Sequence, residues 1–173
     1  MERDAEGRLL VVADASFLIN FLAVDRMDIL GKFPGLRFHL VNHVRAEVRD
    51  DEQRARLGAA LDGGLITEIE ITDHAELRLY DEFRRFLGDG ESASLALAVN
   101  RRWVVAADEK RRFRRELFAR LGEDYLLNTL GALLTAIRKG VITVADAETL
   151  RRRLRENRFA MEPTPFDDLL REE

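Results

Sequence analysis

The sequence predicts an α/β protein built around a parallel sheet. Apolar, β-branched runs typical of short buried strands alternate along the chain with segments of helical pattern. Two of these runs, residues 9–13 and 103–107, end directly at an aspartate, Asp14 and Asp108. Strands that alternate with helices imply parallel pairing, and in open α/β sheets the chemistry sits at the carboxyl ends of the strands. Neighbouring strands lie about 4.8 Å apart, so the two carboxylates could share one divalent cation.

The expected elements follow in order from the same patterns. Short apolar runs predict strands over residues 9–13, 37–41, 65–70, 103–107 and near 124–127. Helical spacing predicts helices over 15–22, 25–32, 43–49, 52–62, 73–87, 91–100, 109–121, 130–139 and 144–156. Gly140 suits the end of a helix, and Asn128 or Thr129 suits its start. From Met161 onward, prolines and acidic residues predict a tail, so we expect one domain over 1–160 and a tail over 161–173.

Composition narrows the class of protein and of site. The chain has 173 residues, of which 46% are hydrophobic and 35% charged, and this balance is typical of a soluble globular domain. No apolar run approaches the roughly 20 residues of a membrane span, and the first residues lack the pattern of a signal peptide, so we expect a cytoplasmic protein. The absence of cysteine excludes disulfides and thiolate zinc sites. The three histidines, His39, His43 and His74, show no metal-ligand spacing.

Net charge is −4, which does not by itself indicate a polyanionic partner, but the positive charges are unevenly distributed. Arginines and lysines crowd residues 101–120 and again 151–158. Such a run is usually a solvated helix face, yet acids interleave less here than that interpretation favours. Arginines near an acidic site could hold a phosphate backbone.

Two glutamates join the two strand-end aspartates as candidate site residues. Glu47 follows the second strand, and Glu91 begins a helix of small residues after Gly88-Asp89-Gly90. Each acid also has a structural interpretation: Asp14 and Asp108 as helix caps, Glu47 as a solvent-facing residue, and Glu91 as a first-turn acid favoured by the helix dipole. Taken together, clustered carboxylates repel unless a cation neutralises them, and an oxygen donor set without cysteine or paired histidine selects Mg²⁺ or Mn²⁺.

Five segments resemble the PIN domain, the ribonuclease fold of VapC-like toxins of toxin–antitoxin pairs. In chain order they are Val11-Val12-Ala13-Asp14-Ala15-Ser16-Phe17-Leu18-Ile19, residues 41–48 around Glu47, Gly90-Glu91-Ser92-Ala93-Ser94, residues 104–109 around Asp108, and residues 128–142. Each motif alone is weak, whereas their order and spacing together are fairly specific.

The resemblance implies an α/β/α sandwich and a cluster of acids that binds Mg²⁺ or Mn²⁺ and cleaves RNA through metal-activated water. Carried over by position, the catalytic and metal-binding acids are Asp14, Glu47, Glu91 and Asp108. Ser16 matches the hydroxyl of the family's Asp-x-Ser/Thr pattern and is expected at the metal or the substrate. Asn128 stands where many members have a further acid, for which Glu109 could substitute in part. The resemblance also implies a homodimer and an antitoxin partner.

Beyond the acids, we expect the substrate to contact Ser16, Arg111, Arg112, Arg115, Asn128 and Thr129. The basic residues after Asp108 wrap around their helix, so Arg111 and Arg115 share one face and Lys110 and Arg114 another. The sequence leaves rival functions open. One is a PIN-like RNA-binding or scaffold protein with little or no catalysis. Another is a phosphohydrolase with Asp14 as nucleophile, which Ser16 in place of a second acid disfavours. Nuclease action on DNA is a third.

Overall fold

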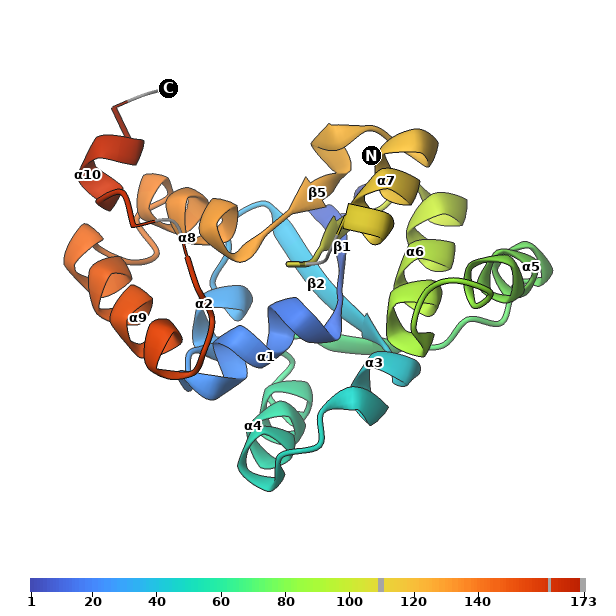
Figure 1. Cartoon of the computed structure of the whole chain (residues 1–173), viewed down its shortest axis with the longest axis horizontal. Helices are drawn as coiled ribbons and strands as arrows, with labels where there is room; N and C mark the ends of the chain where they lie inside the picture. Colours follow the sequence, from blue (N-terminus) through green and yellow to red (C-terminus); the bar gives the residue numbers. More distant parts are fainter. Residues whose placement is uncertain (109–110, 162, 172–173) are drawn as a thin grey trace.

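The computed structural model describes residues 1–108, 111–161 and 163–171, and its centre is a five-stranded, all-parallel sheet (Figure 1). The strands are β1 (Leu9–Ala13), β2 (Leu36–Val41), β3 (Thr67–Ile69), β4 (Val104–Ala106) and β5 (Leu126–Leu127), and they lie in the order β3-β2-β1-β4-β5. Helices flank this sheet. The predicted α/β/α sandwich around a parallel sheet is therefore confirmed.

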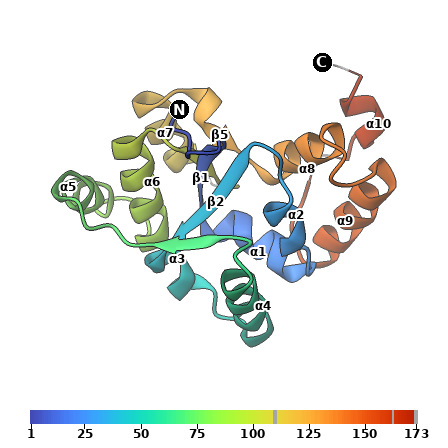
Figure 2. The ribbon, with the colours of Figure 1, turned by 180° about the vertical axis from the view of Figure 1, so that it is seen from behind.

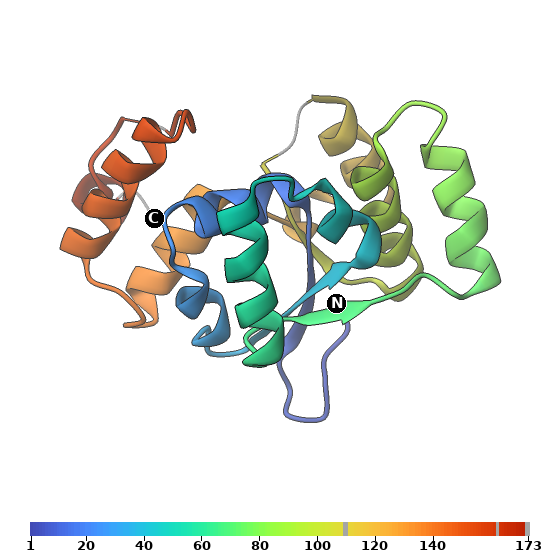
Figure 3. The same cartoon turned by 90° about the horizontal axis from the view of Figure 1, so that it is seen from below.

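The helices connect successive strands and then extend the molecule on one flank. They are α1 (Ala15–Ala23), α2 (Met27–Gly31), α3 (Asn42–Glu47), α4 (Asp51–Asp62), α5 (His74–Phe83), α6 (Asp89–Arg101), α7 (Arg111–Arg120), the 3₁₀ turn η1 (Glu123–Tyr125), α8 (Thr129–Arg138), α9 (Val144–Glu156) and α10 (Phe166–Leu169). Figure 2 shows the same arrangement from behind. In Figure 3 the C-terminal helices (orange to red) lie at one end of the molecule and α5 (green) at the other.

The core forms where apolar helix faces meet the sheet. Phe17 of α1 stacks on Phe38 of β2, with ring centroids 6.1 Å apart. Helix α6 is buried continuously from Ser92 to Ala98, because its small side chains let the backbone approach β1, β2 and β4 closely. No helix of the described residues is both long and apolar enough to cross a membrane.

Several element ends differ from the prediction for local reasons. The helix expected over 73–87 ends at Phe83, where the chain tightens so that Phe86 N–H donates to the Phe83 carbonyl at 3.0 Å. The segment expected as a strand near 124–127 is a 3₁₀ turn followed by the two-residue β5. Helix α6 begins at Asp89, since Gly88 is its N-cap. Glu109 and Lys110, the first residues of the helix expected over 109–121, lie outside the described residues.

The C-terminal segment packs back onto α9. Phe166 of α10 is fully buried, and the Arg151 guanidinium lies over its ring at 4.4 Å from the centroid. Arg151 also donates to the Pro163 carbonyl at 2.8 Å. Residues 163–171 are thus held by specific contacts to the helix that precedes them. The division into a domain over 1–160 and a tail over 161–173 stays a prediction.

Candidate active site at the switch point of the sheet

The two aspartates follow the carboxyl ends of two adjacent parallel strands, β1 and β4. From β1 the chain winds outward to β2 and β3, then returns to β4 on the other side of β1, so the sheet has a switch point between β1 and β4. Ala13 pairs with Ala106 in this register; Asp14 follows Ala13 directly, and Asp108 lies two residues after Ala106. Ligands of open α/β sheets bind at such switch points. The topology therefore places both candidate acids where a ligand is expected.

A single hydroxyl connects the two strand ends. Ser16 Oγ donates to Asp14 Oδ2 at 3.2 Å and accepts from the backbone N–H of Asp108 at 3.1 Å. Asp14 is 1% exposed and is also the N-cap of α1, where its carboxylate accepts from Ser16 N–H at 3.3 Å. Asp14 therefore caps the helix, as the structural interpretation of the sequence expected, and lies at the switch point as well.

The Asp108 carboxylate is oriented by two residues from other helices. Thr129, at the start of α8, donates to it from both its backbone N–H (2.9 Å) and its hydroxyl. Asn20 of α1 donates to Asp108 Oδ2 at 3.1 Å and to Thr129 Oγ1 at 3.2 Å. Asn20 was missed in the sequence analysis, although an amide within the apolar face of α1 was the signal that could have found it. Thr129, expected at the substrate, is 1% exposed and contacts Asp108.

Glu47 is the last residue of α3, and Glu91 lies in the first turn of α6, which packs against α3. Glu47 Oε1 accepts from the backbone N–H of Gly90 at 2.7 Å. A Cβ at position 90 would lie 2.7–2.9 Å from the Glu47 carboxylate, so only glycine permits this approach. Glu91 Oε2 accepts from Gly88 N–H at 2.8 Å, which is the one half of a capping box that a glycine N-cap allows. The first turn of α6 thus fixes the backbone beside both glutamates.

The structure therefore connects Asp14 with Asp108 through Ser16, and it places the Glu47 carboxylate against the backbone of Gly90, the residue before Glu91. Within residues 1–108, 111–161 and 163–171, no three His, Asp or Glu side chains form a group that could hold one metal ion together. The assignment of all four acids to one metal centre stays a prediction.

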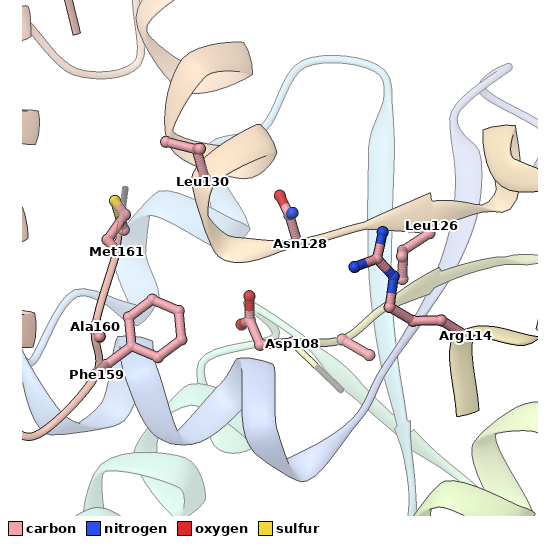
Figure 4. A pocket seen from close by; sticks show the side chains of 9 residues that line it. Asp108, Arg114, Leu126, Asn128, Leu130, Phe159, Ala160 and Met161 are labelled. Carbon is pink, nitrogen blue, oxygen red and sulfur yellow. The ribbon is translucent and has the colours of Figure 1, made fainter. Parts of the chain in front are cut away.

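A pocket of about 250 Å³ opens beside Asp108 (Figure 4). Its polar lining comes from Asp108, Arg114 and Asn128, and its apolar lining includes Phe159 and Met161. Asn128, expected to contact the substrate, also caps α8 by accepting from Gly131 N–H at 2.8 Å. The two apolar residues were missed in the sequence analysis because they belong to the segment after α9, whose sequence gives no sign of where it returns.

The arginines of α7 differ in their surroundings. Arg111, Arg112 and Arg115, which we expected at the substrate, are exposed. Arg112 donates to the Phe86 carbonyl at 3.2 Å, and Arg115 pairs with Glu116 at 3.2 Å. Arg114 is the arginine of α7 that lines the pocket with Asp108. The expectation that Arg114 shares a helix face with Lys110 is not tested, because Lys110 lies outside the described residues.

Comparisons with known proteins agree with this fold. A family model described as a PIN domain matches residues 10–172, so the chain belongs to the PIN-domain family. PIN domains are generally nucleases. Among solved structures, the chain is similar to the crystal structure of PAE2754 from Pyrobaculum aerophilum, with 19% identity and a TM-score of 0.50 over 76% of this chain and 94% of that one. At that identity the likeness supports the fold alone. No curated protein shows significant similarity to this chain.

Proposed function

We propose that this PIN domain is a metal-dependent endoribonuclease that hydrolyses RNA phosphodiesters and acts as the toxin of a toxin–antitoxin pair. The observation that carries the proposal is the contact of Ser16 with both Asp14 and Asp108 at the switch point of the sheet. Ser16 connects two aspartates at the ends of neighbouring strands, and PIN domains are generally nucleases. Both facts support catalysis at the carboxyl ends of β1 and β4.

The donor chemistry fits Mg²⁺ or Mn²⁺. Asp14, Glu47, Glu91 and Asp108 offer only carboxylate oxygens, the ligands that these cations prefer. Gly90 leaves room for the Glu47 carboxylate where any Cβ would intrude, which is the kind of close approach a constrained site requires. When bound, such a cation activates water and stabilises charge on a phosphoryl oxygen.

The chain's own residues then position the acids and the RNA. Ser16 holds Asp14, while Asn20 and Thr129 hold Asp108 in one orientation. The RNA backbone lies along exposed cations near Asp108, with Arg111, Arg112 and Arg115 as phosphate contacts and Asn128 at the pocket. Ser16 and Thr129 act on the substrate through the carboxylates that they orient.

The toxin role implies partners. We infer a cytoplasmic homodimer in which an antitoxin covers the four candidate acids, Asp14, Glu47, Glu91 and Asp108. An antitoxin arginine is the cation that pairs with these carboxylates. Light scattering at tens of micromolar should report a dimer, and a monomer alone would contradict that inference. Co-expression with the product of a small neighbouring reading frame should suppress RNA cleavage by the purified complex.

RNA cleavage with and without Mn²⁺ tests the activity. The parent protein should cleave a generic RNA with Mn²⁺ and lose this activity with a chelator. Asp14→Asn should abolish cleavage, whereas Asp73→Asn, at the N-cap of α5, should retain it. Asp73 is a matched control because its carboxylate caps a helix as Asp14 does, through Ala75 N–H at 2.7 Å. Equal activity of the two variants would overturn the assignment.

A second candidate function is an RNA-binding or scaffold protein with little or no catalysis. It is favoured by the three hydrogen bonds that Asp108 accepts from Thr129 and Asn20, and by the hydrogen bond that Glu91 accepts from Gly88 N–H at the start of α6. These contacts give both acids structural roles. RNA binding by the parent without Mn²⁺-dependent cleavage would identify this alternative.

A further inference from the structure

The apolar wall of the pocket beside Asp108 is held in place by the way α9 ends. Arg158 has a φ of 65°, in the left-handed region, and its N–H donates to the Arg155 carbonyl at 3.0 Å. Phe159 N–H donates to the Leu154 carbonyl at 2.9 Å. These two bonds form a Schellman motif, which stops the helix and turns the chain in a fixed direction. Phe159 is thereby directed to the pocket by backbone geometry.

A second anchor follows the wall. Arg151 donates to the Pro163 carbonyl at 2.8 Å, and Glu148 accepts from Phe166 N–H at 2.9 Å. The segment that carries Phe159 and Met161 therefore runs between the end of α9 and a buried phenylalanine that packs against the same helix. A wall anchored on both sides is a preorganised surface, which lowers the entropic cost of binding.

The opposite side of the pocket is cationic. Arg114 is exposed, and its guanidinium lies over the Phe118 ring, 5.5 Å from the centroid. In Figure 4 Phe159 and Met161 lie on one side of Asp108 and Arg114 on the other, with Asn128 between them. An aromatic face, an amide and a guanidinium around one carboxylate match the base, the polar base edge and the phosphate of a nucleotide.

We propose that this pocket binds one unpaired nucleotide of the RNA, with its base stacked on Phe159 and its phosphate at Arg114. The inference rests on the proposed function, because it assigns the RNA strand a position beside Asp108. The volume of about 250 Å³ is below the roughly 300–1,000 Å³ of sites that enclose a drug-sized ligand, so the pocket takes the base of one nucleotide while its phosphate lies at the rim with exposed Arg114. A base inside a duplex is stacked on its neighbours and cannot stack on Phe159, so single-stranded RNA is the preferred class.

Binding of RNA in a metal-free buffer with chelator tests the subsite without requiring cleavage. Removing one stacking side chain weakens single-strand binding by roughly five- to a hundredfold. Phe159→Leu, which keeps an apolar side chain at this partly buried position, should weaken binding of a short oligoadenylate about tenfold. Phe159→Tyr should bind within about twofold of the parent. Leu77→Ala, at an exposed position on α5, is the control for loss of apolar surface and should bind as the parent does.

Fluorescence gives a second readout at the same position. The only native tryptophan, Trp103, is 5% exposed, so an added tryptophan in Phe159→Trp reports on the pocket. Oligoadenylate should quench the added fluorescence, whereas an abasic strand of the same length and charge should not. Quenching by both strands alike, or parent-like affinity of Phe159→Leu, would overturn the proposal. If the parent does not cleave RNA with Mn²⁺ but oligoadenylate alone still quenches Phe159→Trp, the nuclease function is overturned and the nucleotide subsite is supported.

Discussion

Ser16 Oγ accepts a hydrogen bond from the backbone N–H of Asp108 at 3.1 Å, across 92 positions of sequence. The same oxygen donates to Asp14, so one side chain from the start of α1 connects the ends of β1 and β4. This contact depends on the two strands being neighbours, and it sets the relative position of the two aspartates.

Removing this hydroxyl should cost both stability and activity. Ser16→Ala leaves the Asp108 N–H and the Asp14 carboxylate without this partner, and we expect the free energy of unfolding to fall by about 1–2 kcal/mol. RNA cleavage should fall by more than tenfold, because the two acids lose their common contact. Ser16→Thr keeps the hydroxyl and should stay near the parent in both assays. Urea unfolding that ranks threonine with alanine would contradict the role of the hydroxyl.

Gly90 should separate activity from stability. Gly90→Ala places a Cβ within 3.0 Å of the Glu47 carboxylate, which must swing away, whereas the α6 backbone need not move. We expect metal-dependent cleavage to fall by about tenfold or more while the free energy of unfolding changes by less than about 1 kcal/mol, since alanine favours a helix.

Gly58→Ala is the matched control for this substitution. Gly58 is in the interior of α4, and a Cβ there would meet no atom within 4 Å. This variant should gain up to about 1 kcal/mol of stability and keep full activity. If the two glycine variants cleave RNA equally well, Glu47 has no role in the reaction.

Arg114 should contribute to the salt dependence of RNA binding at the pocket. Arg114→Gln is expected to lower the slope of log K against log salt concentration by about one unit. Arg111→Ala combined with Arg115→Ala should lower it by about one to two units if both contact phosphates. Arg78→Gln on α5, at an exposed position, serves as the control. An unchanged slope in all three proteins would place the RNA elsewhere on the molecule.

His39 should make the fold less stable in mild acid. Burial, with a contribution from the positive charges of Arg37 and Arg101, lowers the pKa of His39 from 6.5 to about 4. Between these values the unfolded chain takes up a proton that the folded protein does not, so the free energy of unfolding falls as pH drops from about 6.5 to 4. The loss is complete below about pH 4.

His39→Phe tests this pH dependence. The variant keeps an aromatic ring beside Trp103, whose ring centroid lies 4.8 Å away, and removes the titrating group. Chemical unfolding between pH 7 and pH 4 should therefore show a flatter profile for the variant than for the parent. Parallel profiles would show that His39 does not contribute.

The sheet could be predicted from the sequence because its signals are local. The apolar runs before Asp14 and Asp108 fix two strands, and the topology then makes these strands neighbours. The four candidate acids could be picked out of the sequence because Asp14 and Asp108 follow apolar runs, Glu47 lies shortly after the second strand and Glu91 lies at the start of a helix. Their role in the reaction stays a prediction. Among the described residues, these acids do not form a group that could hold one metal ion, so the shared metal centre stays a prediction.

The remaining features of the site depend on tertiary packing that no local pattern encodes. Asn20 meets Asp108 only because α1 and the start of α8 come together at the same strand end. Phe159 reaches the pocket because Arg158 adopts a left-handed conformation at the end of α9. Glycine or asparagine is the residue that usually marks such a position in a sequence. With arginine at that position, nothing in the sequence shows where the chain turns.

Calorimetric titration with Mn²⁺ measures whether Asp14 and the other acids at the switch point bind a metal. Asp14→Asn should bind Mn²⁺ at least tenfold more weakly than the parent while remaining folded, because it loses a charged oxygen ligand but keeps an acceptor for the α1 cap. Asp73→Asn should bind Mn²⁺ as the parent does. Equal Mn²⁺ affinity of Asp14→Asn and the parent would contradict the account.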